Sequence, residues 1–100
     1  MRIVASPAVV GFVRAHGGRI FVWTASMAYG YSSRGVFVLE ASIESPGVDR
    51  AFVRFGGEGI EILFDAGDHG TPEELHLALI GRATRQRLAA YWNGHNFASG

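Results

Sequence analysis

Apolar and polar positions alternate through the middle of the chain. Residues 36–43, 50–55 and 60–65 each show a period of two, and turns that contain glycine separate the three segments. A period of two is typical of β-strands with one buried face. Short turns join antiparallel neighbours, because a parallel pair needs a much longer crossover. We therefore predict a three-stranded antiparallel meander over residues 36–65.

The first apolar segment has a different period. Val9, Phe12 and Val13 are spaced three and four residues apart, which places them on one face of a helix. Ser6 is a favourable N-cap residue, and the proline that follows it suits the first helical position. A glycine pair at the other end is able to terminate the helix. These features predict a short helix over residues 7–16.

The remaining segments add further strands. Residues 19–25 are rich in β-branched and aromatic side chains, which favours a strand. A capping box at 71–74 predicts one helical turn, and alternating leucines predict a strand from there to about Arg82. Residues 85–92 fit a strand or a short helix, and we favour the strand. The predicted fold is a mostly-β single domain over residues 1–100: a small antiparallel β-sheet or sandwich with a short N-terminal helix.

Composition narrows the function classes. The chain has 100 residues, of which 48% are hydrophobic and 18% charged, so it is able to bury a core and is not disordered. It has no cysteine, which excludes disulfides, thiolate zinc sites, cysteine-ligated iron–sulfur clusters and thiol nucleophiles. No apolar run approaches the ~20 residues of a membrane helix, and the N-terminus lacks a signal-peptide pattern. We expect a cytoplasmic protein that does not span a membrane.

Charge is segregated along the chain although the net charge is zero. Residues 1–39 carry four arginines and no acid, residues 40–74 carry all nine acids and two arginines, and residues 75–100 carry three arginines. We expect the basic and acidic segments to pack as neighbours, within one chain or across a dimer. This expectation and the neutral total argue against a nucleic-acid partner, since such proteins usually carry a net basic excess.

Histidines and carboxylates supply two alternative chemistries. Five of them fall within a dozen residues, and both types of side chain bind zinc or non-haem iron. No spacing among them matches a known ligand pair, so no metal and no cofactor is predicted. A metal-binding protein remains one alternative, and a small hydrolase using His69 or His95 with a carboxylate is another. The five residues are Asp65, Asp68, His69, Glu73 and His76.

The segment 27–35 is the candidate binding element. It joins two predicted strands and contains two tyrosines, which offer apolar area together with a hydroxyl group. We predict a binding lip formed by Tyr29, Tyr31, Arg34 and His95, with no catalytic residue. In the alternative interpretation the segment is a connecting loop whose tyrosines pack on the core or on a dimer partner.

The order of these segments resembles the HesB-like domain, the fold of A-type iron–sulfur carriers. In that family a short helix is followed by a strand, a cysteine-containing loop, a turn with Pro, Gly and Asp, an apolar strand ending in Asp, and a Leu-x-Gly element. Residues 6–17, 25–31, 46–49, 59–65 and 79–81 resemble the helix, the loop, the turn, the later strand and the Leu-x-Gly element. The resemblance covers most of the chain.

The family's cluster ligands are missing from this sequence. Ser26, Met27 or Ala28 stands where the family has its loop cysteine, and residues 93–97 stand where the family has its C-terminal cysteine pair. The resemblance therefore implies a relative that has lost iron–sulfur binding.

The leading functional hypothesis is a non-enzymatic binding or assembly domain. No catalytic constellation emerges from the spacing, and a chain this short has difficulty covering 12% aromatic residues alone. We therefore predict a homo-oligomer, a dimer in the simplest case, with an unidentified protein partner. The metal-binding protein and the small hydrolase are the alternatives.

Overall fold

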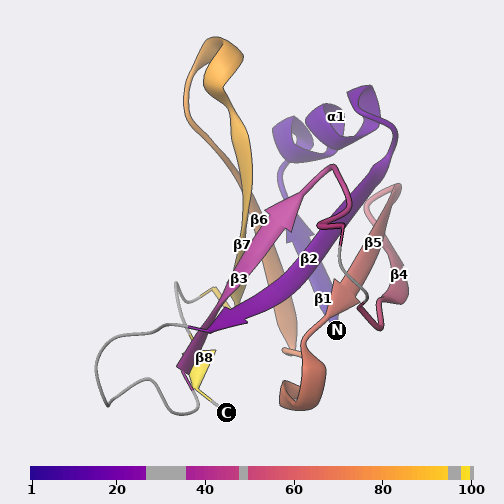
Figure 1. Cartoon of the computed structure of the whole chain (residues 1–100). Helices are drawn as coiled ribbons and strands as arrows, with labels where there is room; N and C mark the ends of the chain where they lie inside the picture. The colour runs from indigo at the N-terminus through magenta and orange to yellow at the C-terminus, as the bar shows by residue number, and fades with distance from the viewer. Residues whose placement is uncertain (27–35, 48–49, 95–97, 100) are drawn as a thin grey trace.

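The computed structural model describes residues 1–26, 36–47, 50–94 and 98–99 (Figure 1). Strands dominate, and one short helix lies near the N-terminus, which confirms the predicted mostly-β class. The elements are β1 (Arg2–Ala5), α1 (Pro7–Ala15), β2 (Arg19–Ser26), β3 (Val36–Ser42), β4 (Val53–Gly57), β5 (Ile60–Asp65), the 3₁₀ turn η1 (Gly67–His69), β6 (Glu74–Ile80), the 3₁₀ turn η2 (Ala83–Arg85), β7 (Arg87–Trp92) and β8 (Ala98–Ser99).

The strands form two mixed sheets. One has the order β1-β6-β7, and the other has the order β4-β5-β2-β3-β8. β1 runs parallel to β6 and β2 runs parallel to β5, whereas the other pairs are antiparallel. The predicted small sheet domain is therefore correct in class, but its sheets are mixed rather than purely antiparallel.

A single core contains the inner side chains of both sheets. Ile20 of β2, Ile62 of β5 and Leu75 of β6 have no exposed surface. α1 packs against β2, β5 and β6 and adds Val9 and Val13 to this core. Successive side chains of a strand point to opposite faces of the sheet, so every second residue of these strands faces the core.

The helix matches its sequence signals. The Ser6 hydroxyl accepts a hydrogen bond from the Val9 amide at 3.3 Å, and proline occupies the first turn. After the last turn the Gly18 amide donates to the Val13 carbonyl at 2.8 Å, which satisfies a carbonyl that the helix leaves free. Among the described residues, no helix has the length and apolar character that a membrane crossing requires.

The predicted meander is wrong in its connections. β3 pairs with β2 and not with β4, while β5 lies between β4 and β2. Residues 50–52, which precede β4, lie on the outer face of the larger sheet, where Phe52 packs edge-on against Phe21 at 5.4 Å. Arg50 lies over the Trp23 ring at 5.9 Å. These contacts hold residues 50–52 out of the strand, so the predicted strand at 50–55 begins only at Val53.

Two smaller differences follow from tertiary packing, and two further predictions are confirmed. The capping box at 71–74 forms no helical turn, and a 3₁₀ turn lies just before it at Gly67–His69. β1 was not predicted; the strand is fixed by its parallel pairing with β6. The predicted strand after residue 74 and the strand interpretation of residues 85–92 are both confirmed, by β6 and β7.

Candidate functional site

The predicted binding lip cannot be placed. Tyr29, Tyr31, Arg34 and His95 all lie outside the residues that the structure describes. The lip therefore stays a prediction, and the candidate sites below are built from other residues.

His69 and His76 lie apart, each in its own small cluster. His69 stacks on Phe37 with 3.9 Å between ring centroids. His76 lies on the outer face of β6, with its Nε2 atom 3.0 Å from the Glu74 carboxylate, which also pairs with Arg2. In the described ranges, no group of three or more histidines and carboxylates is positioned to hold a metal ion.

The carboxylate of Asp65 has a structural role. One oxygen accepts a hydrogen bond from the Gly67 amide at 2.9 Å, which caps the turn after β5. The other lies 3.8 Å from the Arg50 guanidinium. Asp65 therefore anchors the segment that contains Arg50. None of the three cavities described below is lined by a histidine.

The free edge of β4 is the most exposed apolar feature of the described fold. β4 pairs with β5 on one side and ends the five-stranded sheet on the other. Val53 is 57% exposed, and among the described residues no other large hydrophobic residue is exposed. A cavity of about 240 Å³ lies beside it, and Phe55, Phe64 and Ala66 contribute to its walls. An unpaired strand edge next to an apolar cavity offers both backbone hydrogen bonds and apolar surface to a partner.

The sequence of β4 shapes this edge. Its first residues, Val53, Arg54 and Phe55, are large, and its last two are glycines. Gly57 lies against Ile3, and a Cβ atom there would come within 2.8 Å of the Ile3 side chain. The chain then reverses through Glu58 and Gly59, whose φ angles are both positive, at 55° and 77°. Two consecutive positive φ angles are typical of a type I′ hairpin turn.

The charged side chains on the outer face next to β4 are paired with one another. The Glu61 carboxylate of β5 lies 3.3 Å from the Arg54 guanidinium and 2.8 Å from that of Arg19. Arg19 comes from the basic N-terminal segment and Glu61 from the acidic segment. The Arg2–Glu74 ion pair joins the same two segments. For these residues the expected packing of basic against acidic segments is confirmed.

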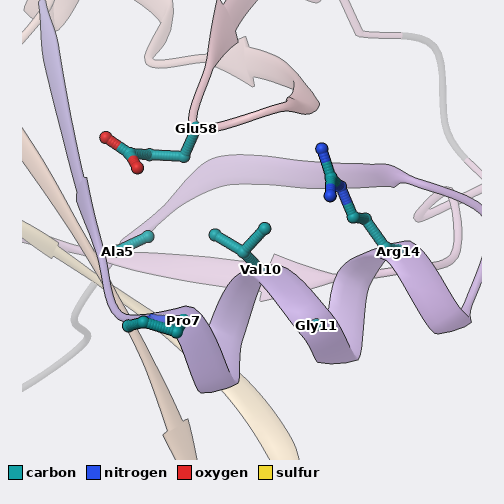
Figure 2. Close-up of a pocket in the computed structure, with 6 residues that line it drawn as sticks. All are labelled: Ala5, Pro7, Val10, Gly11, Arg14 and Glu58. Atoms are coloured by element: carbon teal, nitrogen blue, oxygen red, sulfur yellow. The ribbon is translucent and has the colours of Figure 1, made fainter.

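A second cavity lies between α1 and the β4–β5 turn and has a volume of about 370 Å³ (Figure 2). Figure 2 shows Val10 and Gly11 along the helix, with Arg14 and Glu58 above them. The Arg14 Nε atom donates to the Gly59 carbonyl at 3.3 Å, which ties the helix to the turn. Arg14 and Glu58 are not within ion-pair distance of each other. This cavity is an open surface depression, and its one described hydrogen bond links two elements of the fold.

The three arginines of residues 75–100 belong to the predicted charge pattern but were not predicted as a site. Arg82, Arg85 and Arg87 lie at and beside η2, at the tip of the β6–β7 hairpin, and all three are exposed. None of them takes part in the ion pairs found among the described side chains. The sequence signal was present, since no acid follows Glu74. A third cavity of about 160 Å³ lies beside the first residues of β7, just below the hairpin tip; it is lined by Phe12, Ala41, Ser42, Ile43, Gln86, Arg87 and Leu88.

Comparison with known proteins does not assign this chain to a family. No family model, no curated protein and no solved structure matches this chain. The resemblance to the HesB-like domain therefore stays a prediction, and the functional proposals rest on the geometry described above.

Proposed function

We propose that this chain is a non-enzymatic binding module that assembles as a homodimer through the free edge of β4. The observation that supports this proposal is that no described strand pairs with the outer edge of β4, where Val53 is exposed and an apolar cavity lies beside it. An edge strand that joins the edge of a second copy satisfies its outward N–H and C=O groups and covers its apolar side chains. A two-fold axis makes one patch serve both copies.

The residue sizes in β4 suit pairing with a second copy. In an antiparallel pair centred on Phe55, Val53 of one copy lies opposite Gly57 of the other, and Arg54 lies opposite Gly56. Each large side chain therefore meets a glycine, and only the two Phe55 rings meet directly. Cross-strand aromatic pairs of this kind stabilise antiparallel sheets by up to ~1 kcal/mol. The order of large and small residues in β4 therefore fits an antiparallel copy of the same strand.

Other occupants of this edge are less well supported. An extended strand from a different protein would use the same hydrogen bonds, but it would not explain the size pattern of β4. A nucleic acid does not suit this edge, because Val53 and Phe55 offer apolar contacts and the neighbouring Arg54 is already paired with Glu61. Among the described residues, only the His76–Glu74 pair brings a histidine next to a carboxylate, as metal binding or hydrolysis would require. Both side chains lie on an outer sheet face.

Sedimentation equilibrium tests the proposal. We expect the full chain to show a mass of twice 10.8 kDa at high micromolar concentration and to dissociate on dilution. Val53→Lys places a charge at the edge and should leave a monomer. Because Val53 is 57% exposed, this change should alter the free energy of unfolding of one chain by no more than about 0.5 kcal/mol. Thr84→Lys adds the same charge at the exposed hairpin tip and should leave the dimer intact.

Two outcomes would overturn the proposal. A monomer mass for the unmodified chain at every concentration would exclude the homodimer. A dimer that persists in Val53→Lys, with a midpoint of dissociation equal to that of Thr84→Lys, would show that the interface lies elsewhere.

A further inference from the structure

We propose that the tip of the β6–β7 hairpin and the cleft beside the first residues of β7 form a binding site for single-stranded nucleic acid. In this site the hairpin arginines contact phosphates and the cleft takes one base. The proposal is independent of the β4 edge, since it uses different residues at a different end of the fold.

The hairpin presents its arginines on a well-defined turn. Its tip projects beyond the rest of the fold (Figure 1). The Arg85 amide donates to the Arg82 carbonyl at 2.9 Å, which closes η2. Gly81 has a φ angle of 96°, and a Cβ atom there would lie 2.2 Å from the Arg85 carbonyl oxygen. The backbone that carries Arg82 and Arg85 is therefore closely packed on itself, so the two side chains start from fixed positions.

The charge on this tip is not neutralised by the described part of the chain. Glu61 pairs with Arg19 and Arg54, and Glu74 pairs with Arg2 at the far end of β6. No described carboxylate lies within 4.0 Å of a hairpin arginine. Guanidinium groups bind phosphate oxygens through two parallel hydrogen bonds, which makes arginine well suited to a phosphate chain. The neutral total charge argued against a nucleic acid, but an approaching polyanion responds to the local field at the tip.

The cleft below the tip adds a surface for a base. Its volume is about 160 Å³, and its walls combine the apolar side chains of Phe12, Ile43 and Leu88 with the polar groups of Ser42 and Gln86. The Phe12 ring stacks on the His16 ring, with 4.3 Å between centroids. The His16 Nδ1 atom donates to the Phe12 carbonyl at 2.7 Å, which fixes this aromatic pair. Bases stack on such rings with little sequence preference, while a hydroxyl and an amide next to them are able to meet the base edge.

The combination favours a single strand over the two nearest alternatives. A duplex presents phosphates to the arginines, but its bases stay paired and do not enter the cleft. An acidic protein segment satisfies the arginines, but unlike a nucleic acid it does not carry a planar group on every anionic unit for the Phe12 surface. Arg87 joins the two parts of the site, because it lies next to η2 and also lines the cleft.

Fluorescence anisotropy with a labelled oligothymidylate tests the arginines. We expect binding at low salt, with the logarithm of the association constant falling by about two for each tenfold rise in salt, the value for three phosphate contacts on a single strand. Arg82→Ala and Arg85→Ala should each weaken binding about fivefold or more and should each reduce this slope by about 0.7. Arg54→Ala removes the same charge from an exposed position on β4 and should leave the affinity within about twofold.

A second variant tests the cleft. Phe12→Leu keeps an apolar side chain on α1 but removes the ring, so we expect about tenfold weaker binding with an unchanged salt slope. A circular dichroism melt of each variant confirms that the fold is retained. Val53→Lys should bind the oligonucleotide as tightly as the unmodified chain, which separates this site from the dimer edge.

Three results would overturn the proposal. Equal losses in Arg54→Ala and Arg85→Ala would show diffuse attraction rather than a site. Competition by polyglutamate as strong as that by unlabelled oligothymidylate, together with no effect of Phe12→Leu, would assign the hairpin to an acidic protein. Equal affinity for duplex and single strand would exclude insertion of a base into the cleft.

Discussion

Ile62 and Leu63 are adjacent residues of β5 that should respond very differently to truncation. Ile62 lies opposite Phe55 of β4 and Ile20 of β2 and has no exposed surface. Leu63 points to the outer face of the same sheet and is half-buried. Substitution by alanine removes three carbon atoms in each case. A difference in stability between the two variants therefore reports which face of the sheet each side chain occupies.

The structure sets the size of the difference. Three buried carbon atoms correspond to about 2.4 kcal/mol of transfer free energy, and the cavity left among rigid strands raises the cost of Ile62→Ala to about 3–4 kcal/mol. For Leu63→Ala we expect about 1 kcal/mol, because part of the side chain is already in water. One kcal/mol lowers the melting temperature of a domain of this size by about 4–8 °C. Ile62→Ala should therefore lower it by at least about 12 °C and Leu63→Ala by less than about 8 °C.

Urea titrations and thermal melts at one fixed protein concentration measure both variants. The fixed concentration is needed because dimerisation raises the apparent stability. The dependence of the unfolding free energy on urea should stay the same in both, which shows that the unfolded states are comparable. An equal or larger loss in Leu63→Ala would refute the assignment of the buried face, since a shift of one residue exchanges the two faces of a strand.

Two further predictions test backbone conformation. Glu58 has a φ angle of 55°, which costs most side chains about 1 kcal/mol; Glu58→Asn should raise the free energy of unfolding by about 0.5–1 kcal/mol in a urea titration, and a decrease would contradict the turn geometry. Gly11→Ala should stabilise the chain by about 0.5–1 kcal/mol, because the position is helical and a Cβ atom there has no neighbour within 4 Å. Gly81→Ala should destabilise the chain by about 1–3 kcal/mol, because Gly81 has a positive φ and a Cβ atom there would clash with the Arg85 carbonyl. Changes of the same sign in these two variants would contradict the structure.

Local sequence signals correctly predicted several elements. The Ser6 cap and the apolar spacing after it were sufficient for α1, since the cap hydrogen bond and the buried stripe both lie within one segment. The turn at Glu58 and Gly59 likewise predicted the β4–β5 hairpin, because two residues with positive φ join antiparallel neighbours. Such signals depend on residues close together in the chain.

Pairings between distant segments were not predictable in this way. The parallel pairs of β1 with β6 and of β2 with β5 join residues that are far apart in sequence, and alternation has the same appearance in a parallel and an antiparallel strand. The position of residues 50–52 depends on contacts with Phe21 and Trp23 on another strand. The alternating pattern of this segment therefore predicted a strand that begins three residues too early.

The candidate sites show the same division. The sequence by itself determined the mostly-β class, the helix, the absence of thiol chemistry and the segregation of charge, because each follows from composition or from neighbouring residues. Only the tertiary structure decided that β4 ends a sheet, that Glu61 and Glu74 pair with Arg19 and Arg2, and that the hairpin arginines lack a described acidic partner. The physical reason is that exposure and charge pairing depend on distances in space, which the order of residues along the chain does not specify.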